Sequence, residues 1–169
     1  MLDLNELTKE QLVELVKIQA KNTIACDGCW FQALERERGM DEAIHFDEET
    51  WKRFPRSEAR RAKKFLGLDE HSGLDGLERA LPLRAASISN EYEITREADA
   101  LVFRITNCRV QEARASKGMP YHPCKSVGAF EHETFASAID ERISVECLSC
   151  FPEVTDDTCN CSWRFEIRE

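Results

Sequence analysis

The sequence contains no uninterrupted apolar stretch of about 18 residues, the length that a membrane-spanning helix requires. It begins Met-Leu-Asp-Leu-Asn-Glu-Leu, which lacks the basic segment and the apolar run of a secretory signal. Repeats, low-complexity tracts and Gly/Ser linkers are also absent. We therefore expect a cytoplasmic protein without a membrane segment. At 169 residues, we expect one domain spanning residues 1–169.

Several motifs with known chemistry are missing as well: the P-loop, the dinucleotide fingerprint, the nucleophile elbow and H-E-x-x-H. Basic residues are outnumbered by acidic ones, with 23 Lys and Arg against 32 Asp and Glu, which gives a formal net charge of −9. Binding to phosphates needs a positive field, so this balance disfavours nucleic acid as a partner. We expect the basic stretch from Arg56 to Lys64 to be a solvated helix face.

Cysteine, in contrast, is plentiful, with eight in the chain. In a reducing compartment such cysteines indicate metal ligands or reactive thiols, not a disulfide framework. The spacing Cys147-Leu-Ser-Cys150, followed by Cys161 and preceded by Cys124, predicts a closed tetrahedral zinc site with these four ligands. Cys159 is an alternative to Cys161, because the two face the same way in an extended segment. An iron–sulfur cluster or buried free cysteines would use the same residue types.

The first half of the chain, residues 1–82, has helical patterning. Thr8 and Gln11 form a capping box, and a helix is predicted from there to about Ala25. We expect Asp27-Gly28 to break it, with a second helix running to Gly39. Apolar residues expected on the inner faces of these helices are Leu12, Val13, Val16, Ala20, Ile24, Trp30, Ala33 and Leu34. Further on, Pro55 should kink or restart a helix that stops at Gly67.

The second half, residues 83–169, is mixed. Strands are predicted at 87–95 and 101–106, a loop at 113–123, a helix just after Cys124, and strands at 143–147 and 161–167. The order strand-strand-helix-strand-strand, after N-terminal helices, predicts an α+β domain with an antiparallel sheet.

The cysteine segment resembles a known family. Cys124-Lys-Ser-Val-Gly128, Cys150 and Cys161-Ser-Trp163-Arg-Phe165 are similar to the vinyl-4-reductase domain, a small-molecule-binding module also found in aromatic-responsive transcription activators. The resemblance implies a structural zinc held mainly by cysteines, with Cys147 in the place of a carboxylate ligand and Glu146 as its substitute. It also implies a pocket for a small ligand between the helices and the sheet.

Two further likenesses concern most of the chain. The chain resembles a group of uncharacterised cytosolic proteins of anaerobic bacteria. The likeness is carried by the stretch Trp30…Glu35…Gly39…Ala43…Asp47…Trp51 and by the ending Cys161-x-Trp163-x-Phe165. The helical half and the cysteine-rich strand ending are similar to the L-2-amino-thiazoline-4-carboxylic acid hydrolase family. That likeness implies hydrolysis of a small cyclic substrate, with Cys108 or an acid such as Asp47 in the mechanism.

Other candidate residues can be interpreted in two ways. Trp30, Trp51 and Cys108 are candidates for contact with a ligand, or they are packed core residues. If Cys26-Asp-Gly-Cys29 lies at a helix N-terminus, we expect the pair to be redox-active or to bind a metal. The alternative is that both cysteines pack between helices. His122 could join the metal shell or lie in a solvated loop.

Together the observations favour a zinc-binding domain that binds a small molecule, with a homodimer possible. A hydrolase and an iron–sulfur or redox protein are the alternatives.

Overall fold

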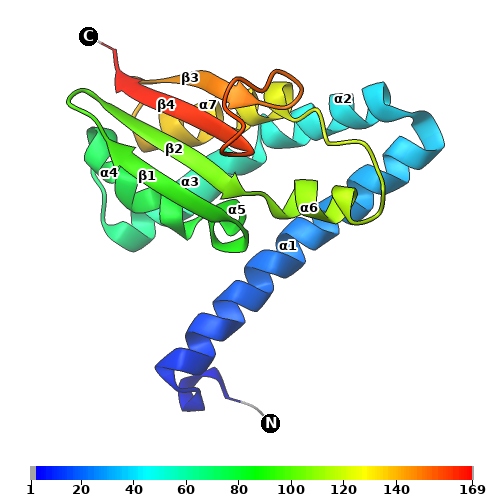
Figure 1. Cartoon of the computed structure of the whole chain (residues 1–169). Helices are drawn as coiled ribbons and strands as arrows, with labels where there is room; N and C mark the ends of the chain where they lie inside the picture. The colour runs from blue at the N-terminus through cyan, green and yellow to red at the C-terminus, as the bar shows by residue number, and fades with distance from the viewer. Residues whose placement is uncertain (1–2, 169) are drawn as a thin grey trace.

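The computed structural model describes residues 3–168 and shows a four-stranded antiparallel sheet with helices packed on one face (Figure 1). The strands are β1 (Glu91–Arg96), β2 (Ala100–Asn107), β3 (Ile143–Cys150) and β4 (Cys161–Ile167), in the spatial order β1-β2-β4-β3. The predicted α+β class with an antiparallel sheet is therefore confirmed.

Most of the helices precede the sheet. They are α1 (Lys9–Arg38), α2 (Met40–Trp51), α3 (Phe54–Leu66), α4 (Gly73–Ala80) and α5 (Ala85–Ser89), with α6 (Arg109–Ala115) and α7 (Lys125–Ile139) between β2 and β3. Single 3₁₀ turns occupy Leu4–Glu6 and Leu81–Leu83. No helix within residues 3–168 is both long enough and apolar enough to cross a membrane.

The core lies between the sheet and α7. Alternate residues of β2 and β4 point inward, so that Phe103, Trp163 and Phe165 pack against Phe135 of α7. Gly128 allows α7 to approach this layer closely, because a Cβ at this position would lie 2.7 Å from the Trp163 ring. The alternation that predicted β2 and β4 is thus the pattern that builds the core.

Helix α1 differs from the prediction. It is continuous over 30 residues, so Asp27-Gly28 does not break it, and it ends where Gly39 adopts a positive φ of 89°. A glycine inside a helix costs only about 1 kcal/mol, which packing of α1 against α2 and α5 outweighs. Trp30, predicted to point inward, is 69% exposed. The N-terminal half of α1 stands clear of the rest of the molecule (Figure 1).

The local signals at other helix ends are confirmed. Thr8 and Gln11 form the capping box, Pro55 lies in the first turn of α3, and Gly67 ends that helix with a φ of 64°. Two boundaries were wrong. Residues 87–89 belong to α5, so the first strand begins at Glu91, and α6 covers the start of the loop predicted at 113–123.

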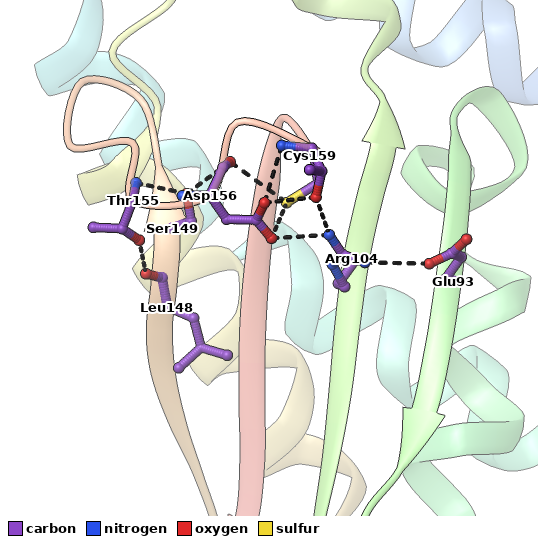
Figure 2. A network of polar contacts seen from close by, with 8 residues as sticks. Glu93, Arg104, Leu148, Ser149, Thr155, Asp156 and Cys159 are labelled. Atoms are coloured by element: carbon purple, nitrogen blue, oxygen red, sulfur yellow. Dashed lines mark hydrogen bonds and ion pairs between the residues drawn. The ribbon is translucent and has the colours of Figure 1, made fainter.

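The loop between β3 and β4 is held against the outer face of the sheet (Figure 2). Arg104 of β2 donates to Asp156 at 2.8 Å, and the Cys159 thiol lies 3.5 Å from the same carboxylate. Ser149 accepts from the backbone N–H groups of Thr155 and Asp156. These contacts fix the turn that brings the end of β3 next to the start of β4.

Candidate functional site

A cavity of about 130 Å³ lies between α1, α2, α7 and the end of the sheet where the cysteines gather. Ten ionisable side chains line it, together with the polar Asn90 and Gln111; the ten are Asp27, Asp47, Arg84, Cys108, His122, Cys124, Glu131, His132, Cys150 and Cys161. A cavity with so many convergent ionisable groups is the usual form of an active or binding site.

The strand pairing explains why four thiols meet at this cavity. Cys150 ends β3 and is the ladder partner of Cys161, which begins β4. Cys108 follows β2, which also pairs with β4. Cys124 is the N-cap of α7, as predicted, and its Sγ lies 3.5 Å from the Sγ of Cys150.

The structure brings together three of the four predicted metal ligands, Cys124, Cys150 and Cys161. Cys147 packs against the core opposite Trp163, but it does not line the cavity. The alternative ligand Cys159 lies in the Arg104–Asp156 network on the outer face of the sheet (Figure 2). No group of three or more His, Cys, Asp or Glu within residues 3–168 has an arrangement that could hold a metal ion. The zinc site therefore stays a prediction.

A histidine is the group that sequence analysis undervalued. His122 is 6% exposed, and its Nε2 lies 3.3 Å from Oδ2 of Asp47. Burial lowers the pKa of His122, but Asp47 and the neighbouring Cys124 outweigh burial and raise it to about 9. Nδ1, the other ring nitrogen, is buried without a hydrogen-bond partner among the described residues, sulfur atoms included. His122 and Cys124 are nevertheless close enough for each to shift the pKa of the other.

The Cys124 thiol is the most acidic thiol in the cavity. Its pKa is lowered because the Cys150 thiol donates a hydrogen bond to it and because His122 stabilises the thiolate. Nε2 of Gln111 lies 3.6 Å from the same sulfur, and the N-terminus of α7 adds the positive end of a helix dipole. Burial raises the pKa of Cys108 to about 12, so Cys108, our predicted candidate nucleophile, stays protonated at neutral pH.

The loop that carries His122 is held in place by two buried polar side chains. Gln111 donates to the carbonyl of His122 and accepts from its N–H, both at 2.9 Å. Arg114 binds both carboxylate oxygens of Glu35 at 2.7 Å and donates to the carbonyl of Pro120 at 2.6 Å. No local sequence pattern marks either residue, because their partners lie on other segments of the chain.

The opposite wall of the cavity is acidic. Burial, reinforced by Asp47 and Glu131, raises the pKa of Asp27 to about 6. Burial also raises the pKa of Glu131, although Arg84 opposes it from 2.6 Å. Arg84 also forms an ion pair with Glu58 at 2.9 Å, so its single positive charge does not balance the carboxylates around it. The wall therefore favours a positively charged ligand.

The remaining predicted residues lie in different places. Trp51 lines the cavity, whereas Trp30 lines a separate open groove between α1 and α2. Cys26 and Cys29 are exposed in the middle of α1. Our prediction that this pair lies at a helix N-terminus was wrong, so a helix dipole does not activate it.

Residues 5–167 match the family of unknown function DUF6125, and the chain belongs to that family. No curated protein and no solved structure matches the chain. The family description names no ligand or reaction, so the chemistry rests on the side chains of the cavity.

Proposed function

We propose that this member of DUF6125 is a thiol-dependent hydrolase of a small, cationic, amidine-type ring compound. In this proposal Cys124 is the nucleophile, His122 is the general acid and base, and Asp47 holds the imidazole in position. One observation carries the proposal: Asp47 lies 3.3 Å from Nε2 of His122, and His122 and Cys124 line the same cavity, close enough for each to shift the pKa of the other. This is the arrangement of a nucleophile activated by an oriented base.

The charge states support this assignment. With the pKa of His122 raised to about 9 and that of Cys124 lowered, neutral pH favours a thiolate beside an imidazolium. The thiolate attacks the electrophilic ring carbon, a C–S bond forms, and the electron pair of the C=N bond moves to nitrogen. The ring bond to the leaving heteroatom then breaks, and His122 gives its proton to that atom.

Water completes the reaction. The neutral imidazole of His122 takes a proton from water as the water oxygen attacks the same carbon. The bond to Cys124 breaks, which restores the thiolate and the imidazolium, and the net change is addition of one water to the ring. In these reaction steps every proton moves between His122, the substrate and water, so no other co-reactant is needed.

The cavity supports the proposed substrate class. Asp27 and Glu131 face a space of about 130 Å³, close to the ~150 Å³ that holds one benzene-sized molecule. A planar amidinium has N–H donors that pair with carboxylates in the same way as arginine. The resemblance to L-2-amino-thiazoline-4-carboxylic acid hydrolases implies a substrate of this kind.

The experiment is a turnover assay with a panel of 2-amino-thiazolines and related cyclic amidines, followed by mass spectrometry. We expect Cys124→Ala to lower kcat at least about 10³-fold, because it removes the nucleophile. Cys108→Ala is the matched control and should keep activity within about tenfold. Wild-type protein quenched during turnover should carry the substrate fragment on the Cys124 peptide. Equal loss in the two variants, or turnover by Cys124→Ala, would overturn the proposal.

A second candidate is the zinc-binding ligand-binding domain that the sequence predicts. It is supported by the 3.5 Å spacing of the Cys124 and Cys150 sulfurs. Two thiolates on one tetrahedral zinc, with bonds of about 2.3 Å, lie about 3.8 Å apart. Metal analysis and a visible spectrum of protein purified without oxygen separate the candidates. One zinc per chain would favour this candidate, iron with visible absorbance would favour a cluster, and a metal-free protein with fast alkylation of Cys124 would favour the hydrolase.

A further inference from the structure

One face of α1 carries a row of exposed residues with coiled-coil spacing. The row runs Leu12, Val16, Gln19, Thr23, Cys26 and Trp30, with steps of four, three, four, three and four. All six side chains are exposed, including Leu12 at 40%, Val16 at 53% and Trp30 at 69%. This 3.5-residue period is the pattern by which two helices pack side by side. None of the six residues is charged.

The two ends of this row have different surroundings. The N-terminal half of α1 stands clear of the molecule, so Leu12 and Val16 project from an isolated helix (Figure 1). Such a short stretch is marginally stable without a packing partner. The C-terminal half borders an open groove, where Trp30 meets Phe46 of α2 and Phe54 of α3. Phe46 is 46% exposed and Phe54 37% exposed.

The two ends fit each other across a two-fold axis at the level of Lys21. In antiparallel pairing, Leu12 lies opposite Trp30 of a second copy, and Val16 lies opposite its Cys26. We infer that the protein is a dimer in which the N-terminal half of each α1 fills the groove of the other copy. A polar pair, Gln19 with Thr23, falls on each side of the axis and specifies the register at some cost in stability.

The surface chemistry favours a second copy over other occupants. The charged residues Glu10, Glu14, Lys17 and Lys21 lie on the opposite face of α1. A membrane surface or a nucleic acid would be attracted by a cluster of basic residues beside the apolar row, whereas the row is flanked by one basic residue, Lys9, at its N-terminal end. Burying the five exposed apolar side chains of the row and groove in both copies removes roughly 1,000 Å² from water, the lower limit of a specific interface. The five are Leu12, Val16, Trp30, Phe46 and Phe54.

Pairing would also affect the cavity. Asp27 and Asp47 line both the groove and the cavity, so they form the partition between the two spaces. A helix from the second copy lying in the groove would cover this partition on its solvent side and hold α1 and α2 together. The dimer does not depend on the hydrolase proposal, because it rests on the outer face of α1 and on the groove, and not on the thiols or His122.

The first test is the molecular mass in solution over a concentration series, by light scattering and sedimentation velocity. We expect wild type to dimerise with a Kd near the micromolar range, as modest interfaces do. Val16→Glu should weaken dimerisation at least about 100-fold by burying a charge in the row. Ile18→Glu is the matched control, because Ile18 is also exposed, at 45%, but lies off the row. It should dimerise like wild type, and circular dichroism should show that both variants are folded.

The second test fixes the register. In a Cys29→Ser background, Val16→Cys should form a disulfide with Cys26 of the second copy under mild oxidation, and Ile18→Cys should not. The crosslink should vanish when Cys26→Ser is added. A monomer at all concentrations, equal effects of the two Glu variants, or a dimer without the 16–26 crosslink would each overturn the inference.

Discussion

Replacing Asp47 by Asn removes the negative charge 3.3 Å from Nε2 of His122 while it keeps the size of the side chain. The pKa of His122 is raised to about 9, against an ordinary value of 6.5. That difference corresponds to about 3 kcal/mol in favour of the imidazolium. Burial opposes the charged form, so without Asp47 only Cys124 sustains it. Loss of one close opposite charge should lower the pKa of His122 by about 1–3 pH units.

The sign of the pH effect follows from the two partners. The thiolate–imidazolium pair exists above the pKa of Cys124 and below the pKa of His122. In Asp47→Asn the imidazolium loses its proton at a lower pH than in wild type. The alkaline limb of the pH–rate profile therefore shifts to lower pH. The pKa of Cys124 rises as well, because its positive neighbour is less often charged. The pH range that supports activity therefore narrows from both sides.

Two measurements check this prediction. An NMR titration of the imidazole gives the pKa of His122 directly, and the alkylation rate of the Cys124 peptide by iodoacetamide gives its thiolate fraction. Asp156→Asn is the control, because Asp156 pairs with Arg104 on the outer face of the sheet and should not affect either value (Figure 2). A wild-type His122 that titrates near 6.5, unchanged in Asp47→Asn, would refute the reasoning.

Three further predictions concern stability. Gly128→Ala places a Cβ 2.7 Å from the Trp163 ring and should lower the free energy of unfolding by about 1–3 kcal/mol in urea titrations; no loss would contradict the close packing. Asp140 has its pKa lowered, first by hydrogen bonds from Arg142, so its stabilisation is present above the unfolded value of about 3.9 and is lost as pH falls. Asp140→Asn should therefore be about 1–3 kcal/mol less stable than wild type at neutral pH, with the gap closing in acid; a constant gap would contradict this. Arg84→Met removes a buried guanidinium from two partly buried carboxylates, Glu58 and Glu131, and should cost about 3 kcal/mol, whereas an unchanged melting temperature would show that the charge is not needed.

Sequence analysis predicted well the elements whose signals are local. The capping box at Thr8, the glycines at 39 and 67, and the alternation of Leu101, Phe103 and Ile105 each depend on neighbours a few residues away. It failed where distant packing decided the outcome. Asp27-Gly28 has a helix-breaking composition, yet α2 and α5 pack along that part of α1 and keep it helical. No residue close in sequence carries that information.

Within the candidate site, too, some contacts could be predicted from the sequence and others could not. The meeting of Cys150 and Cys161 follows from pairing of the last two strands, which the sequence indicates. The pairing of Asp47 with His122 joins α2 to the segment before α7, and no periodicity or motif connects the two. His122 could have been found only from its position two residues before Cys124. The spacing of the cysteines thus identified three side chains of the cavity, and proximity in sequence to Cys124 was the one signal for His122.

The two functional candidates require different acid–base states of the cavity thiols. A zinc site of four cysteines needs four thiolates, and metal binding must displace every proton that remains on them. Burial raises the pKa of Cys108 to about 12 and that of Cys147 to about 11, and the pKa of Cys150 is raised by its hydrogen bond to Cys124. The pKa of Cys124 is shifted in the opposite direction, toward the thiolate. A hydrolase needs no more than this, because one thiolate attacks while the neighbouring neutral thiol of Cys150 donates a hydrogen bond that stabilises it. In the metal-free protein the cavity therefore offers the one thiolate that a nucleophile requires, whereas a zinc site would have to release the protons of Cys147 and Cys150 on binding.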